Sequence, residues 1–226
     1  MFGRRRPYDR RRLLADAAKA QRRGKLRKAI ELYGRVLEVE PDNADLHRRL
    51  ALLQARTRQG PEAWASYRRA AEGLAQHGFV ERAIGVYREA SDHVPREESL
   101  WLALADLEMQ RGRRADAVAA LRTGRGHFRA RADRARAIRL LERAHAFDPA
   151  DFETSFDLAG LLLRTELRGR AIRLLAALAP TAHGRQLRRL RARQFRASPR
   201  LRAAWRWLSA ALGAEPRNAR PRARRG

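Results

Sequence analysis

Apolar residues along most of the chain recur at spacings of three, four and seven positions, with polar residues between them. This period matches the turn of an α-helix and predicts helices with one apolar face over residues 11–212. Breakers such as Gly24, Pro41 and Pro95 interrupt the pattern at short intervals. No stretch of useful length alternates apolar and polar residues as a strand does. The pattern therefore predicts an all-α chain of about twelve helices, each of roughly 11–17 residues, joined by short loops.

The helical pattern itself repeats every 54 residues. A fixed period of this size is typical of a stacked array, in which each unit buries its apolar face against its neighbours. The function of such a protein lies on an extended surface rather than in a catalytic cleft. Positions that share the period are Ala29, Ala83 and Ala137; Pro41, Pro95 and Pro149; and Ala63, Ala117 and Ala171.

These residues resemble the tetratricopeptide repeat, a family whose 34-residue unit is a pair of antiparallel helices. Residues 98–131 fit the family pattern through Trp101, Leu104, Gly112 and Ala117. Small residues let two helices pack closely, and a bulky side chain one turn away fills the remaining space. The resemblance implies an α-solenoid, a right-handed superhelix of antiparallel helix pairs, over residues 10–213. Further partial matches fall in residues 10–43, 44–77, 64–97, 118–149 and 152–185.

The chain departs from the family in the spacing of its alanines. Ala29 and Ala63 are 34 residues apart, whereas Ala63 and Ala83 are 20 apart, and both steps then repeat. Each period is therefore interpreted as one repeat plus an extra helix. The predicted units are residues 24–77, 78–131 and 132–185, followed by a shortened fourth unit at 186–213 that contains Phe195, Pro199, Trp205, Leu208 and Ser209.

The resemblance also implies a surface for a partner, because the inner face of a tetratricopeptide superhelix is lined by fixed positions of each first helix. Arginines there would hold an acidic or C-terminal peptide through charge-assisted hydrogen bonds. The alternative is that these arginines are solvated charges with no specific role. The lysine and asparagine of the subfamily that grips chaperone tails are missing, so that role is not predicted. Carried over to this sequence, the candidate groove residues are Arg48, Arg56, Arg68, Gln76, Asp106 and Gln110.

Charge adds a second candidate surface. The formal net charge is +26, most of it near the two ends, where residues 1–9 and 214–226 are predicted to be disordered basic segments. In the helix predicted at residues 185–196, arginines three or four positions apart repel one another unless an anion lies against them. Nucleic-acid phosphate, an anionic lipid surface or an acidic protein would each fit, so a nucleic-acid-associated function is the alternative. The possible anion patch consists of Arg185, Arg188, Arg189, Arg193 and Arg196.

Nothing in the sequence predicts catalysis, a cofactor or a metal site. The chain has no cysteine, which excludes disulfides and thiolate ligands. Its six histidines are scattered singly, and no glycine motif for phosphate or dinucleotide binding occurs. The apolar stretches are too short to cross a bilayer or to serve as a secretory signal. We therefore expect a cytoplasmic, non-catalytic scaffold that binds a protein or peptide partner, with an acidic partner as one alternative.

Overall fold

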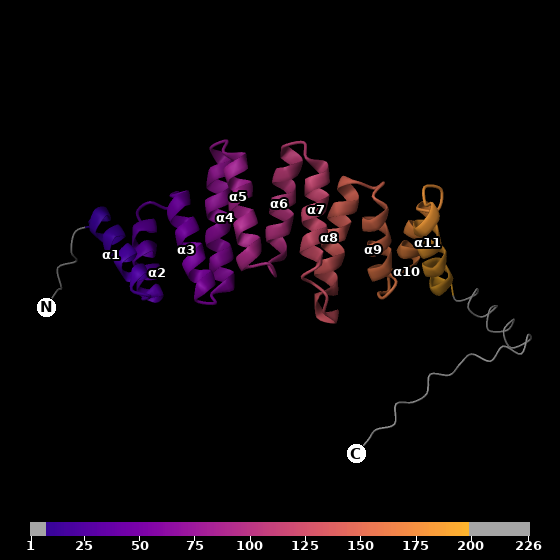
Figure 1. Cartoon of the computed structure of the whole chain (residues 1–226), viewed down its shortest axis with the longest axis horizontal. Helices are drawn as coiled ribbons and strands as arrows, with labels where there is room; N and C mark the ends of the chain where they lie inside the picture. Colours follow the sequence, from indigo (N-terminus) through magenta and orange to yellow (C-terminus); the bar gives the residue numbers. More distant parts are fainter. Residues whose placement is uncertain (1–7, 199–226) are drawn as a thin grey trace, which may run out of the picture. The chain divides into compact units, whose positions relative to one another are not determined.

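The computed structural model describes residues 8–198 of the chain. Within this range the chain forms eleven α-helices and one short 3₁₀ helix, and no strand (Figure 1). The predicted all-α solenoid class is therefore confirmed. The expected twelfth helix, with Trp205, Leu208 and Ser209, and the basic segment 214–226 lie outside the described residues. Of the predicted N-terminal segment, only Tyr8 and Asp9 are described.

The chain divides into two compact units, residues 1–148 and residues 149–226. In the first unit, the helices are α1 (Arg10–Arg22), α2 (Leu26–Leu37), α3 (Ala44–Arg56), α4 (Gly60–Gln76), α5 (Val80–His93), α6 (Glu98–Gln110), α7 (Arg114–Arg125) and α8 (Arg134–Phe147), with the 3₁₀ helix at Arg131–Asp133. In the second unit, the described helices are α9 (Phe152–Leu162), α10 (Arg168–Ala177) and α11 (Gly184–Ala197).

Local sequence explains where several of these helices begin and end. Asn43 caps α3, because its side-chain oxygen accepts a hydrogen bond from the backbone N–H of Leu46 at 3.1 Å. After α6 the chain turns at Gly112 with a φ of 74°, a conformation that favours glycine. Arg58 adopts the same left-handed conformation after α3, with a φ of 62°. Short loops of this kind make consecutive helices antiparallel neighbours.

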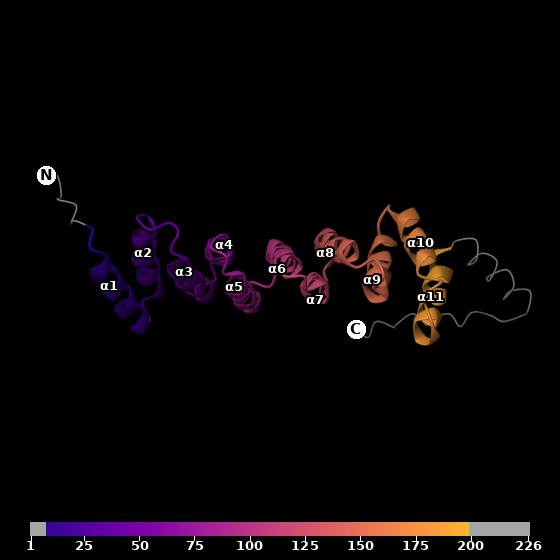
Figure 2. The ribbon, with the colours of Figure 1, turned by 90° about the horizontal axis from the view of Figure 1, so that it is seen from above.

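The helices of the first unit form two sides. Figure 2 shows α3, α5 and α7 along one side, and α4, α6 and α8 along the other. Each helix packs against the next one in the sequence, and within a side α3 also contacts α5 and α6 contacts α8. We call these the odd side and the even side. A side chain on one helix can therefore contact the neighbouring helix on the same side, as between α3 and α5 or between α6 and α8.

The core lies between the two sides and is built from the small and aromatic residues that the sequence pattern singled out. Ala63, Ala83 and Ala117 are fully buried, and Tyr67 and Trp101 are buried beside them. A Cβ atom on Gly124 of α7 would collide with the ring of Trp101 on α6, so only glycine fits at this crossing. Close helix packing around a bulky side chain therefore holds the first unit together.

Candidate functional site

The six residues predicted to line one groove fall on both sides of the first unit. Arg48 and Arg56 lie on α3, on the odd side. Consecutive helices of this array lie on opposite sides. The prediction took both α3 and α4 as first helices of repeats, although these two helices are consecutive. The structure therefore separates two of the six residues from the rest. On the even side it places Arg68 and Gln76 of α4 with Asp106 and Gln110 of α6.

On the odd side, Arg48 is engaged within the fold. Its Nε donates to Oε2 of Glu89 on α5 at 2.6 Å, and a second pair joins Arg82 to Asp45 at 3.5 Å. The hydroxyl of Tyr67 also donates to Glu89, and burial together with this carboxylate raises the pKa of Tyr67. These contacts tie α3 and α4 to α5. Arg56, by contrast, is exposed.

On the even side, two ion pairs join α6 to α8. Arg139 donates to both carboxylate oxygens of Glu98, at 2.7 and 2.6 Å, and Arg143 donates to Asp106 at 2.7 Å. The hydrogen bonds that Arg139 donates to Glu98 raise the pKa of its guanidinium. Asp106 is thus already paired, whereas Gln76 and Gln110 are exposed at the last residues of α4 and α6.

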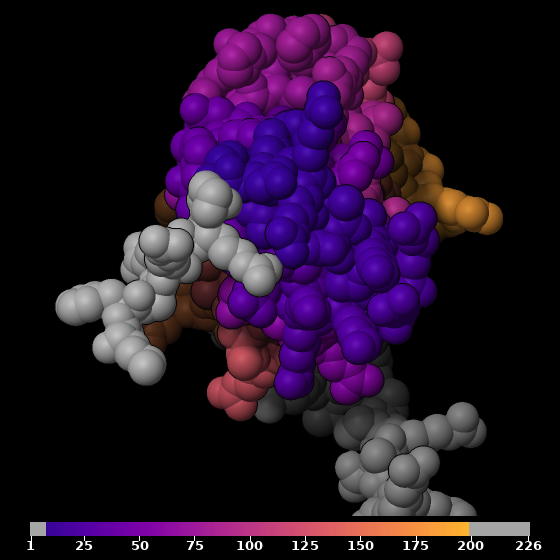
Figure 3. All heavy atoms as spheres, turned by 90° about the vertical axis from the view of Figure 1, so that its left-hand side faces the viewer, coloured from indigo at the N-terminus to yellow at the C-terminus, as the bar shows by residue number. Residues whose placement is uncertain are grey.

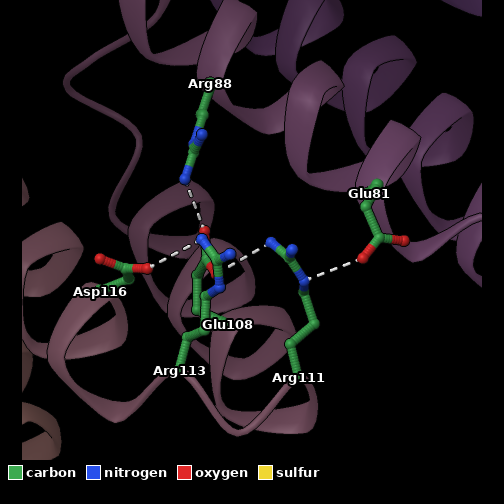
Figure 4. Close-up of polar contacts among 6 residues, drawn as sticks. All are labelled: Glu81, Arg88, Glu108, Arg111, Arg113 and Asp116. Carbon is green, nitrogen blue, oxygen red and sulfur yellow. Dashed lines mark hydrogen bonds and ion pairs between the residues drawn. The ribbon is translucent and has the colours of Figure 1, made fainter.

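The structure also contains a charged cluster that the sequence reasoning missed. Glu108 of α6 is only 1% exposed, and it accepts hydrogen bonds from Arg88 of α5 at 2.8 Å and from Arg111 at 3.4 Å (Figure 4). Arg111 continues to Glu81 of α5 at 3.1 Å. The sequence did hold a signal for this cluster, because Glu108 lies four positions after the core residue Leu104 and so falls on the same, buried face of the helix. This cluster, which we call the Glu108 junction, fastens α5 to α6 and has the character of a structural network.

Some arginines of the predicted anion patch on α11 contact α9, and the others are exposed to solvent. Arg189 binds both carboxylate oxygens of Glu153 on α9, at 2.5 and 3.0 Å. Arg193 lies over the ring of Phe156, 3.5 Å from its centroid, and donates to the backbone carbonyl of Phe156. Burial lowers the pKa of Arg193. These two arginines hold α11 on α9 within the second unit.

The remaining arginines of the patch are exposed. Arg185, Arg188 and Arg196 form no ion pair with any described residue, and the same holds for Arg191, which the prediction left out. Three of the five predicted patch residues therefore remain candidates for binding an anion.

A run of antiparallel helices with small residues at their crossings defines an α-helical repeat protein. Two family models match the chain: a TPR repeat at residues 22–57, which covers α2 and α3, and a tetratricopeptide repeat at residues 128–193, which covers α8, α9, α10 and most of α11. The chain therefore contains tetratricopeptide repeats in these two stretches. Repeats of this kind present extended surfaces to other proteins.

Solved structures to which the chain is similar include a tetratricopeptide repeat protein from Parabacteroides merdae, at 18% identity and a TM-score of 0.30 over 92% of this chain and 94% of that one. A putative kinesin light chain with TPR-like repeats from Podospora anserina is also 18% identical, with a TM-score of 0.36 over 92% and 97%. PilF from Pseudomonas aeruginosa is 17% identical, with a TM-score of 0.26 over 91% and 88%. No curated protein matches the chain.

Two general features of the described residues bear on function. None of the helices between residues 8 and 198 has the length and apolar character to span a membrane. In the same range, no group of three or more histidine, aspartate or glutamate side chains gathers where it would hold a metal ion.

Proposed function

We propose that the protein is a cytoplasmic, non-catalytic scaffold that binds a partner protein or peptide on an exposed side of its helical array. The two tetratricopeptide matches carry this proposal, because such arrays act through extended surfaces. Enzyme chemistry needs acidic, basic and nucleophilic groups that converge on one point. In the first unit, acidic and basic groups pair across neighbouring helices instead, as Arg48 does with Glu89.

The even side is the better candidate for the partner surface. On α6, Leu102 and Met109 are half-buried and lie on the same face as Asp106, because their spacing of four and three positions matches a helical turn. Apolar side chains open to solvent among polar ones suit a peptide that buries a few side chains of its own. Methionine adapts easily to different partners. The free amides of Gln76 and Gln110 add hydrogen-bonding groups at the helix ends.

Affinity purification from the source cell tests this assignment with two matched variants. The even-side variant combines Arg68→Glu with Met109→Glu. The odd-side control combines Arg56→Glu with Leu52→Glu, which changes one exposed arginine and one half-buried apolar residue on α3. We expect the even-side variant to lose a partner that the wild type and the control both retain, with circular dichroism confirming that each is folded. A partner that only the control loses would move the surface to the odd side. A partner that neither variant loses would overturn the proposal of binding on these two sides.

A second candidate function is binding to nucleic acid through α11. The observation that favours it is that Arg185, Arg188 and Arg196 are exposed and form no ion pair within the part of the chain that the structure describes. Gel shifts with single-stranded RNA and duplex DNA, titrated against salt, test it. Binding through phosphates should weaken with a log–log slope of about −0.7 to −0.9 for each phosphate contacted. The variant Arg185→Gln with Arg188→Gln should weaken binding more than the control Arg49→Gln with Arg114→Gln. The absence of any shift at low salt would reject this function.

A further inference from the structure

An open cleft of about 600 Å³ lies between α1 and α2. Figure 3 looks onto this end of the first unit, where the two helices, drawn in indigo, face solvent. The cleft lies apart from the even side, and it involves none of the residues predicted to bind a partner.

The floor of the cleft is apolar. Ala20 and Leu32 are 5% and 8% exposed, and Leu13 is half-buried beside them. All three belong to, or pack against, the core that α1, α2 and α3 share. The floor is therefore a fixed surface of the folded protein, and an apolar side chain of a ligand would gain by covering it.

The rim of the cleft is strongly cationic. Five exposed side chains line it without forming an ion pair to any described residue: Lys19, Arg23, Lys25, Lys28 and Arg35. Lys19, Lys25 and Lys28 are the only lysines in the sequence, in which lysine and arginine together number 51. A lysine carries a compact charge on a flexible stem, so it adapts to carboxylates at several positions.

The acidic residues of the cleft do not offset this charge. The Asp9 side chain caps α1 by accepting from the backbone N–H of Arg12 at 3.0 Å. Asp16 lies 4.0 Å from Arg12. Glu31 also lines the cleft, as a single carboxylate among the five cations of the rim. The start of α2 at Lys25 has no side-chain cap, so the positive end of that helix adds to the field over the cleft. Five like charges around an apolar floor favour an anionic ligand.

We propose that this cleft, the lysine cleft, binds an acidic segment of a partner protein. An apolar side chain of the segment covers Ala20 and Leu32, and its carboxylates lie against the lysines and arginines of the rim. The aliphatic floor fits an apolar side chain of such a segment, and binding of nucleic acid, which would have to place a base there, is an alternative outcome of the test below. The proposal does not depend on the even side, and either surface would remain if the other were disproved.

Fluorescence anisotropy with the full chain tests the proposal. The probe is a labelled 16-residue peptide of glutamate and leucine, with leucine at every third or fourth position, and binding is measured at low and moderate salt. Three comparison probes are a peptide with glutamine in place of glutamate, a peptide with serine in place of leucine, and a 16-nucleotide single-stranded RNA. We expect each changed peptide to bind roughly tenfold more weakly, because each loses one of the two kinds of contact.

Matched variants separate the cleft from the general positive charge of the chain. The cleft variant is Lys19→Gln with Lys28→Gln and Arg35→Gln, and the control is Arg49→Gln with Arg56→Gln and Arg114→Gln, which removes the same charge from exposed positions elsewhere. The cleft variant should bind the glutamate–leucine peptide roughly tenfold more weakly, and the control less than twofold more weakly. Equal losses in the two variants would overturn the proposal. RNA binding that exceeds peptide binding and depends on the cleft would overturn it as well, in favour of a nucleic-acid site.

Discussion

The Glu108 junction and the lysine cleft both concentrate charged side chains in the first unit, but they use charge in opposite ways. At the junction, a buried carboxylate is enclosed by Arg88 and Arg111, which come from two neighbouring helices or their ends. At the cleft, exposed cations such as Lys19 and Lys28 surround an apolar floor and form no ion pair with any residue between 8 and 198. The comparison teaches that the charge of a region does not tell how much of it is available to a ligand.

Helix α11 lies between these two cases. Its sequence contains six arginines and no acidic residue. Two of them, Arg189 and Arg193, are engaged with α9, and the other four are exposed and form no ion pair with described residues. The arginines of α11 therefore fall into two groups: Arg189 and Arg193 stabilise the packing of α11 on α9, and the others are open to an anion.

The largest expected effect comes from removing both partners of Glu108. Arg88→Ala with Arg111→Ala leaves a buried carboxylate without a counter-charge, and we expect a loss of about 3 kcal/mol in the free energy of unfolding. Urea denaturation followed by circular dichroism measures it.

A third substitution identifies the cause of that loss. Adding Glu108→Leu removes the buried charge as well, so the triple variant should regain most of the lost stability. If the triple variant is as unstable as the double variant, the arginines stabilise the junction through packing and not through charge. The proposed difference between the junction, where charges are paired, and the cleft, where they are open to a ligand, would then be wrong.

A smaller loss should follow from Arg193→Ala on α11. This change removes the contact with the Phe156 ring and the hydrogen bond to the Phe156 carbonyl, and we expect a cost of about 2 kcal/mol. Arg188→Ala, on the same helix but exposed, should change stability by less than about 0.5 kcal/mol. Thermal unfolding of the two variants gives the comparison, and equal melting temperatures would remove the distinction between the two populations of arginine.

Alkaline pH should weaken the first unit through its tyrosines and not through its arginine pairs, because arginine stays charged there. Burial and then Glu72 raise the pKa of Tyr87 to about 12, and burial and then Glu89 raise that of Tyr67. The unfolded chain loses these protons near pH 10 while the folded chain keeps them. Stability is therefore full below pH 10 and falls above it, by roughly 1 kcal/mol for each tyrosine at pH 11.

Denaturation at pH 8 and pH 11 checks this expectation. The variant Tyr67→Phe with Tyr87→Phe should lose most of the difference between the two pH values, whatever its stability at pH 8. An unchanged difference would show that other groups cause the alkaline loss.

The smallest effect on stability is expected at the lysine cleft itself. Lys19→Gln with Lys28→Gln removes two exposed charges that have no partner among the described residues, so unfolding should change by less than about 0.5 kcal/mol. A rise in stability would fit relief of repulsion between the rim charges. A loss of 1 kcal/mol or more would show that these lysines serve the fold, and the cleft would then resemble the Glu108 junction.

The period of 54 residues remains a proposal, and two contacts support it. Trp101 Nε1 donates to the carbonyl of Pro95 at 2.9 Å, and His47 Nε2 lies 2.8 Å from the carbonyl of Pro41, one period earlier. With three helices in a period and two sides in the array, the equivalent helices α3 and α6 fall on opposite sides. Arg48 and Arg56 on α3 therefore fall on the side opposite to the other four candidate groove residues, and the partner-binding role of all six stays a prediction.

The sequence by itself determined the all-α class, the tetratricopeptide resemblance and most of the packing residues, because helical periodicity and small residues at crossings are local properties. Ala63 and Trp101 were recognisable from spacing alone. Only the tertiary structure decided which charges are free. The two partners of an ion pair lie on different helices, 41 residues apart for Arg48 and Glu89 and 37 apart for Asp106 and Arg143. Such pairs form only when the helices stack, so the surface that remains for a partner is a property of the fold.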